Sequence, residues 1–237
     1  MKTIKCLFAS LFLISIGQLT AQTSFTLNLG GPDPVETIQN SFIFADGTIK
    51  ATATAWSISG AAANPSFMQS EVVQWSPGLG VKNSSEVITD TPYVPFYVDN
   101  ENHYDFVLFI FSGKVDIMHV AINPSGRTFD LDASFWLGNV NPALNLTGQS
   151  LEGLDALGLG SPLSNDAAAS NSPRSVPVVT PTGGVNALLF GARVNGDVNL
   201  DRFKISSVSG TTVIPEPSSA ALAMMLGGFA LCRRKRA

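Results

Sequence analysis

The amino-acid sequence predicts an all-β protein whose body, residues 22–212, is an antiparallel β-sandwich of jelly-roll type. Three observations support this prediction. The 237-residue chain is 45% apolar and only 14% charged, so it can bury a large core and differs from a disordered chain. The body consists of short runs with strand periodicity, separated by turn-forming residues. One of these runs, residues 127–137, alternates strictly between two kinds of residue.

The expected strands follow one another along the body and are punctuated by Gly, Asn, Asp, Ser and Pro. They cover residues 24–29, 40–45, 49–58, 71–75, 104–111, 114–122, 127–137, 185–192 and 200–208. Two of the turns predict hairpins, one at Ser112-Gly113 and the other at residues 123–126. Each hairpin would pair the strands on either side of its turn.

Residues 127–137 show the sandwich pattern most clearly. A period of two places one set of side chains towards the core and the other outward. The inward set is Phe129, Leu131, Ala133, Phe135 and Leu137, and the outward set is Thr128, Asp130, Asp132, Ser134 and Trp136. Residues 106–111, in contrast, are apolar on both faces, which predicts a central strand that is covered on both sides.

The strand pattern breaks between Gly138 and Val185. Residues 151–157 fit one or two helical turns with Ser150 as the N-cap. Residues 158–184 are rich in Gly, Ser, Asn and Pro, so we interpret this stretch as a long loop and not as a second domain.

The first 21 residues have the pattern of a secretory signal peptide, which is expected to form a helix. Lys2 and Lys5 precede an apolar run over residues 7–16, which is too short to span a bilayer alone. Cleavage is expected before Gln22, with cleavage after Gly17 as the alternative. This interpretation makes the export machinery and a signal peptidase the first partners.

Charge and cysteine content narrow the function further. Residues 22–214 hold eight Lys and Arg against 17 Asp and Glu, a net charge of −9. An acidic body of this kind is not expected to bind nucleic acid, because that affinity comes largely from neutralising phosphates. The two cysteines, Cys6 and Cys232, lie in the terminal segments, so neither a disulfide framework nor a cysteine-ligated metal is expected in the body.

The last segment, residues 213–237, combines three features in a fixed order. Pro215, Glu216 and Pro217 come first, residues 220–232 are uncharged, and a cationic run closes the chain. That run is Arg233, Arg234, Lys235 and Arg236. Thirteen residues make a helix of about 20 Å, which is short for a hydrocarbon core of about 30 Å. We therefore expect a short transmembrane helix, retained by its basic end and preceded by an exposed, Pro-flanked site.

This tail resembles the PEP-CTERM sorting signal. The resemblance covers about 23 residues, and it implies cargo of an exosortase, an integral membrane enzyme of Gram-negative bacteria that make exopolysaccharide. It implies export, transient inner-membrane anchoring, removal of the tail near the triplet, and delivery to the cell surface or the extracellular matrix. Residues 104–108, 134–138, 186–191 and 201–205 are similar to segments of all-β PEP-CTERM cargo proteins, a resemblance that transfers no catalytic residue. The alternative is an ordinary C-terminal membrane anchor.

The sequence predicts no catalytic centre. The candidate bases for a Ser-His-acid triad are His103 and His119, and Gly148-Gln149-Ser150-Leu151-Glu152-Gly153 misses the nucleophile-elbow spacing. Asp130 and Asp132 lie two positions apart on one expected strand, roughly 7 Å, which is near the separation of inverting glycosidases. A secreted glycan-active hydrolase using such acids is therefore the alternative to a non-enzymatic protein.

Two binding hypotheses remain. Asp99, Glu101, Asp105, Asp130 and Asp132 could supply hard oxygen ligands to Ca²⁺, although we otherwise expect no cofactor. An exposed Trp136 beside Asp130 and Asp132 could hold a sugar ring; alternatively, Trp136 packs under a loop. The function expected from the sequence is an exported surface or matrix protein, structural or associated with exopolysaccharide.

Overall fold

The structure, a computed structural model, describes residues 22–32, 37–59, 65–86, 96–124, 127–194 and 200–213. Within this part the chain is almost entirely β-strand, and every pairing between named strands is antiparallel, which confirms the all-β prediction. Residues Gln22–Val213 form one compact unit. The expected signal helix, Pro215-Glu216-Pro217 and the cationic run from Arg233 to Arg236 lie outside the described residues.

Thirteen strands and one 3-10 helix make up the described fold. They are β1 (Ser24–Asn28), β2 (Thr37–Gln39), β3 (Ser41–Asp46), β4 (Ile49–Ser59), β5 (Phe67–Trp75), β6 (Gly78–Lys82), β7 (Val98–Asp99), β8 (His103–Asn123), β9 (Ala133–Gly138), η1 (Asp155–Leu157), β10 (Leu163–Asn165), β11 (Arg174–Pro177), β12 (Val185–Ala192) and β13 (Arg202–Thr212).

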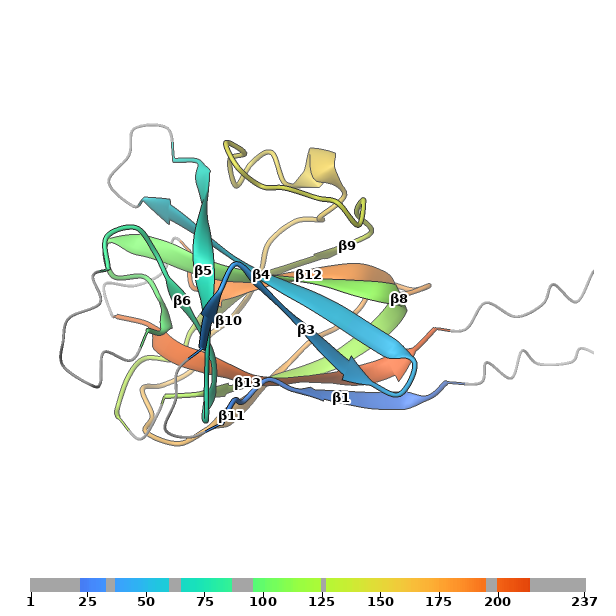
Figure 1. Ribbon diagram of the computed structural model, residues 1–237, viewed down its shortest axis with the longest axis horizontal. Helices are drawn as coiled ribbons and strands as arrows, with labels where there is room; N and C mark the ends of the chain where they lie inside the picture. The colour runs from blue at the N-terminus through green and yellow to red at the C-terminus, as the bar shows by residue number, and fades with distance from the viewer. Residues whose placement is uncertain are drawn as a thin grey trace, which may run out of the picture. The chain divides into compact units, whose positions relative to one another are not determined.

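The long strand β8 belongs to two layers. Its first half pairs with β4 and β12, and β12 pairs in turn with β9. Its second half pairs with β13 and β11, and β13 pairs with β1. Figure 1 shows β4, β12 and β9 in one layer and β1 and β13 in the other, with β8 curling from the first layer to the second. β5 and β6 connect β4 back to β13, so the hydrogen-bonded path closes on itself.

Both predicted hairpins are wrong. Ser112 and Gly113 lie inside β8, at the point where its pairing changes from β4 to β13. The Ser112 hydroxyl accepts a hydrogen bond from the Lys50 amide at 3.0 Å, and Gly113 does not have the positive φ that a tight turn requires. The two residues therefore mark a bend within one strand.

The second predicted hairpin is wrong because β13, and not β9, pairs with the second half of β8. β9 pairs with β12 and β10, and it does not pair with β8. The predicted strand over 127–137 also begins later, at Ala133. Before that residue, Phe129 and Asp130 make only isolated bridges, to Ser170 and Asp201.

The core has two parts, one on each face of the β4–β8–β12–β9 layer. The first lies between the layers and includes Val107, Phe109 and Phe190. The second includes Phe106 and Leu108 and is covered by residues from the segment 139–159. Alternate residues of β8 therefore enter different clusters, which confirms the prediction that residues 106–111 form a central strand covered on both faces.

The segment that covers the second cluster contains the predicted helical region. The structure shows only the 3-10 helix η1 there, so the expected one or two helical turns are largely absent. Ser150 is not the N-cap of η1, because that position is Leu154 and no side chain caps it. The Ser150 hydroxyl instead accepts a hydrogen bond from the Gly153 amide at 3.2 Å, in the turn before the helix.

The bend in β8 leads to a direct prediction. A Cβ added at Gly113 would lie 3.9 Å from Ile49 Cδ1, an ordinary contact. We expect Gly113→Ala to leave the free energy of unfolding unchanged or to raise it by about 0.4–1 kcal/mol, because alanine restricts the unfolded chain. Denaturant titration measures this. A loss above about 1 kcal/mol would instead indicate a turn that needs glycine.

Gly80→Ala serves as the contrasting variant. A Cβ there would lie 1.9 Å from the carbonyl oxygen of Phe96, so backbone must move, and the same titration should show a clear loss of stability.

Candidate functional site

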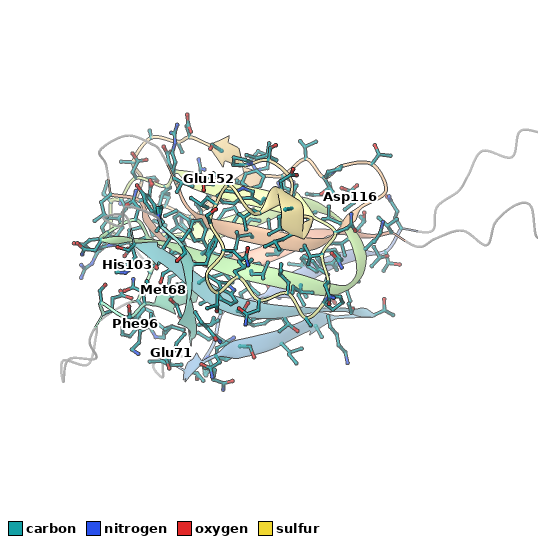
Figure 2. The ribbon with its side chains drawn as sticks, turned by 90° about the horizontal axis from the view of Figure 1, so that it is seen from above. Met68, Glu71, Phe96, His103, Asp116 and Glu152 are labelled. Carbon is teal, nitrogen blue, oxygen red and sulfur yellow. The ribbon has the colours of Figure 1, made fainter. Side chains whose placement is uncertain are left out.

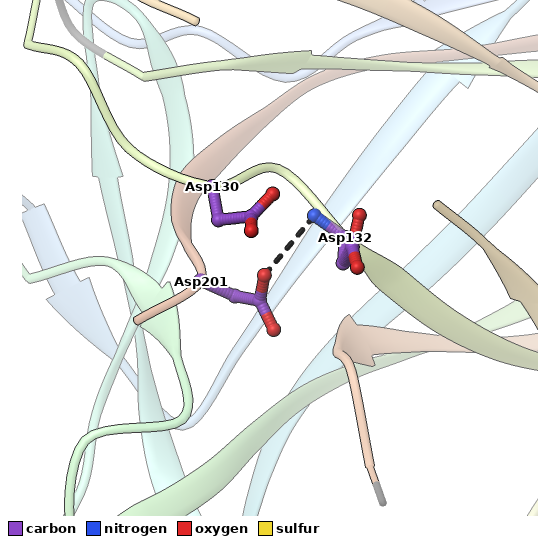
Figure 3. A group of neighbouring side chains, drawn as sticks. All are labelled: Asp130, Asp132 and Asp201. Atoms are coloured by element: carbon purple, nitrogen blue, oxygen red, sulfur yellow. Dashed lines mark hydrogen bonds between the residues drawn. The ribbon is translucent and has the colours of Figure 1, made fainter. Parts of the chain in front are cut away.

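Three aspartates meet where the chain enters β9 and β13. Asp130 and Asp132 precede β9, and Asp201 directly precedes β13. One carboxylate oxygen from each lies within 4.8 Å of the others (Figure 3). An isolated parallel bridge between Asp130 and Asp201 brings the two segments together, and the Arg202 amide donates to the Asp130 carbonyl at 3.2 Å.

Protein donors already bind all three carboxylates. The Leu131 amide donates to Asp130 Oδ1 at 2.9 Å. The Asp132 amide donates to Asp201 Oδ1 at 3.1 Å, which Figure 3 marks with a dashed line, and Asn100 Nδ2 donates to Asp201 Oδ2 at 2.9 Å. The Ala167 amide donates to Asp132 Oδ1 at 2.6 Å. Arg193 Nη1 lies 2.7 Å from Asp132 Oδ2 and 2.6 Å from Asp166 Oδ1. The cluster thus ties together segments that are far apart in the sequence.

The cluster carries excess negative charge in a buried setting. Asp132 and Asp201 are only 3% and 1% exposed. Burial, followed by repulsion from Asp132 and Asp130, raises the pKa of Asp201 to about 7. Burial also lowers the pKa of Arg174, against the attraction of the same aspartates. Burial causes both pKa shifts, because it disfavours the charged form of an acidic group and of a basic group alike.

The geometry does not match the glycosidase expectation. Asp130 and Asp132 lie before β9, not two positions apart within a regular strand. One oxygen of each carboxylate lies within 4.8 Å of an oxygen of the other, in a cluster that also contains Asp201. Asp132 is also held by Arg193. The arrangement is suited to structural cross-linking, and its oxygen donors are of the type that Ca²⁺ prefers.

The other predicted calcium ligands do not assemble. Among the described residues, Asp99, Glu101 and Asp105 are not a group that offers one ligand atom each within the same 4.8 Å limit. Arg202 instead forms ion pairs with both Asp99, at 3.4 Å, and Glu101. Asp105 is fully buried and accepts a hydrogen bond from Asn83 Nδ2 at 3.2 Å. A cavity of about 350 Å³ borders Asp99, Glu101 and Arg202.

Burial dominates the electrostatics of this second acidic group. It raises the pKa of Asp99 to about 7 and the pKa of Asp105 well above its usual value. Repulsion from Glu86 adds to the rise at both residues. The folded protein therefore retains protons here that the unfolded chain loses.

These pKa values predict that stability declines with increasing pH. A raised carboxyl pKa stabilises the fold fully below the unfolded value near 4, and this stabilisation is lost as pH rises through the folded value. We expect the free energy of unfolding to fall between about pH 5 and pH 7, by up to about 1.4 kcal/mol per pH unit for each such group. Denaturant titrations across this range, compared with Asp99→Asn, measure it. A wild-type stability that rises over the same range would contradict the predicted sign.

Trp136 is not the exposed aromatic residue that the alternation suggested. Its side chain is 2% exposed and packs edge-to-face on Phe106, with ring centroids 5.8 Å apart. The alternative, packing under a loop, is what the structure shows, because residues of the segment 139–159 cover this face. One side of Trp136 still borders a cavity of about 300 Å³.

The two histidines do not form a triad in the described structure. His103 Nδ1 lies 3.3 Å from the Ser85 hydroxyl, but that hydroxyl donates to Asn83 Oδ1 at 2.6 Å. His119 is exposed on β8. The Ser85 hydroxyl proton is thus directed to Asn83 and not to His103.

Sequence reasoning missed Asp201 and Arg193 as members of the aspartate cluster. Both lie more than 60 positions from Asp132, and neither stands in a recognisable motif. Asp201 lies within the predicted strand 200–208, whereas the observed strand begins at Arg202. The three-dimensional arrangement was needed to place Asp201 beside Asp130.

Comparison with known proteins adds no assignment to this geometry. The chain matches no protein-family model, no curated protein and no solved structure. Within the part of the chain that the structure describes, no helix has the length and apolar character needed to cross a membrane.

Proposed function

We propose that this chain is an exported surface or extracellular-matrix protein, processed by an exosortase, that associates with glycan and does not catalyse a reaction. The observation that carries the proposal is the tail: Pro215-Glu216-Pro217, an apolar run and a basic end, in a chain that also begins with a signal-like segment. β13 ends at Thr212, and two residues of sequence separate it from Pro215. Cleavage near the triplet would therefore leave the body intact.

The properties of the body support this proposal. It contains no cysteine, so its two apolar clusters must stabilise it outside the cell. Its net negative charge argues against nucleic acid as a partner. The Asp132 and Asp201 carboxylates are bound by protein donors, an arrangement that favours a structural role over acid–base catalysis.

The proposed sequence of partners follows from the two ends of the chain. The export machinery and signal peptidase act on residues 1–21. The basic end, Arg233 to Arg236, anchors the protein transiently in the inner membrane, and the exosortase then removes the tail. Exopolysaccharide or another envelope component is the final partner, at the cell surface or in the matrix.

A paired assay tests binding against catalysis. The exported protein is incubated with exopolysaccharide from the same cells, and retention in a pull-down is measured beside the release of reducing ends. The proposal predicts retention without release. If the wild-type protein releases reducing ends and Asp132→Asn does not, the non-enzymatic assignment is overturned in favour of a glycan-active hydrolase.

Calcium is the cofactor alternative that the geometry favours, because Asp130, Asp132 and Asp201 bring three carboxylates together. If the cluster binds Ca²⁺, the ion should raise the unfolding temperature of the wild-type protein, and Asp130→Asn should abolish that rise. An unfolding temperature that does not respond to Ca²⁺ would leave the cluster as a structural network.

A further inference from the structure

A cavity of about 300 Å³ opens between the covering segment and the β9–β10 pair. Ser134 and Trp136 of β9 line it from the sheet, and Ser164 of β10 lies across from Ser134 in the strand register. Leu151 and Glu152 line it from the covering segment. Figure 2 labels Glu152 near η1 in that segment.

The floor and the rim of the cavity differ in exposure. Ser134 and Trp136 are 1% and 2% exposed, so the floor is shielded by the fold. Glu152, Pro162 and Ser164 are exposed, so the rim is open to solvent. A small molecule can therefore reach the rim side chains without unfolding the segment, while the Trp136 indole stays largely buried at the base of the cavity.

Local hydrogen bonds shape the cavity in advance. The Ser134 hydroxyl accepts from the Val194 amide at 3.1 Å, which fixes one wall. The Gln149 carbonyl accepts from the Phe67 amide at 2.8 Å, and the Gly148 amide donates to the Phe67 carbonyl at 2.9 Å. These bonds tie the covering segment to β5, so little ordering is needed when a ligand binds.

The lining combines the two properties that a sugar ring requires. The Leu151 and Pro162 side chains are apolar and suit the C–H face of a pyranose, above the largely buried Trp136. The Ser164 hydroxyl and the Glu152 carboxylate are polar and suit its hydroxyl groups. The volume is at the lower end of the range of about 300–1,000 Å³ for ligand sites, which fits one sugar residue and not a buried chain.

The charge of the cavity lining limits the class of sugar that the cavity is expected to bind. Glu152 is the charged side chain that lines the cavity, and it lies on a body of net negative charge. A carboxylate repels an acidic sugar and attracts an ammonium group, whereas a neutral sugar is tolerated. Uronic acids are therefore disfavoured, and hexoses and amino sugars are favoured.

We propose that the cavity bordered by Trp136, Glu152 and Ser164 binds one neutral or amino-sugar residue at the end or branch of a glycan. This inference rests on the proposed association with glycan and names the place and the sugar class. Trp136 provides the apolar floor from beneath the covering segment, and Glu152 selects by charge at the rim.

The test is a titration of the full chain with single sugars, in a detergent that has no sugar headgroup. The probes are methyl glucoside, glucosamine and glucuronate. Their binding is measured by calorimetry and by the change in tryptophan fluorescence. Ligands of this size are expected to bind weakly, with dissociation constants in the millimolar range. The expected order of affinity is glucosamine, then methyl glucoside, with glucuronate weakest.

Two variants locate the binding. Ser164→Trp places a ring over the rim at an exposed strand position that accepts aromatic residues, and it should weaken both favoured sugars by at least about tenfold. Glu152→Gln should weaken glucosamine by about tenfold and methyl glucoside much less. Asp155→Asn is the matched control, because it removes a nearby exposed charge outside the lining and should leave both affinities unchanged.

The outcomes separate this inference from the proposed function. The inference is overturned if Ser164→Trp, folded by circular dichroism, binds sugars as the wild type does, if the wild type binds none of the probes, or if it prefers glucuronate. Retention of exopolysaccharide despite such a result would leave the proposed function standing with a different binding surface. Conversely, sugar binding by a protein that keeps its tail in the membrane would refute the processing route alone.

Discussion

Replacing Arg193 with alanine is expected to lower the free energy of unfolding by roughly 3 kcal/mol. Arg193 contacts both Asp132, at 2.7 Å, and Asp166, at 2.6 Å. Without the guanidinium, Asp132 would remain buried beside Asp130 and Asp201 with less compensating positive charge. The Arg193 side chain is 24% exposed, so we expect the lower end of the range of about 3–5 kcal/mol for a broken buried pair.

Denaturant titration near neutral pH measures the effect, with Lys82→Ala as the matched control. Lys82 pairs with Glu71, whose side chain is 42% exposed, so its loss should cost only about 0–1 kcal/mol. If Arg193→Ala is no more destabilising than Lys82→Ala, the aspartate cluster does not hold the β9 and β13 segments together as described.

The second large effect is expected at Phe190 of β12. Its ring is fully buried and lies 5.9 Å from the Phe135 ring and 6.0 Å from the Phe203 ring, measured between centroids. Phe135 belongs to β9 and Phe203 to β13, so Phe190 joins the two layers. Phe190→Ala should lower the free energy of unfolding by about 3–5 kcal/mol, because a cavity adds to the lost transfer free energy.

Ile43→Ala is the control for this variant. Ile43 is 70% exposed on β3, so its truncation should change the free energy of unfolding by no more than about 0.5 kcal/mol. Similar losses for the two variants would mean that Phe190 does not occupy the centre of a packed core.

Local sequence patterns predicted the strands well where burial determines the pattern. Residues 106–111 are apolar at every position, and this correctly predicted a strand with both faces covered. β12 has the predicted bounds, Val185–Ala192, because it combines a clear apolar run with glycine-rich punctuation at its start. The short strands β2, β7, β10 and β11 carry too few residues to show a period and were not predicted.

Contacts between residues far apart in the fold determined the features that local sequence patterns could not predict. Ser112-Gly113 has the composition of a turn, yet the chain continues because β4 and β13 offer successive partners to one strand. Trp136 sits at an outward position of β9, yet the segment 139–159, which follows this strand, folds back and covers it. Asp201 pairs with Asp130 through a single isolated β-bridge. The positions of the two residues in the sequence do not predict this contact.

Removal of the tail near Pro215-Glu216-Pro217 can be measured by the intact mass of the protein recovered from the cell surface or medium of its own host. We expect a polypeptide that lacks the N-terminal signal and ends close to this triplet, without Cys232 and the four cations that follow it. A surface or secreted protein whose mass still includes Arg233 to Arg236, or a full-length chain found solely in the inner membrane, would contradict it.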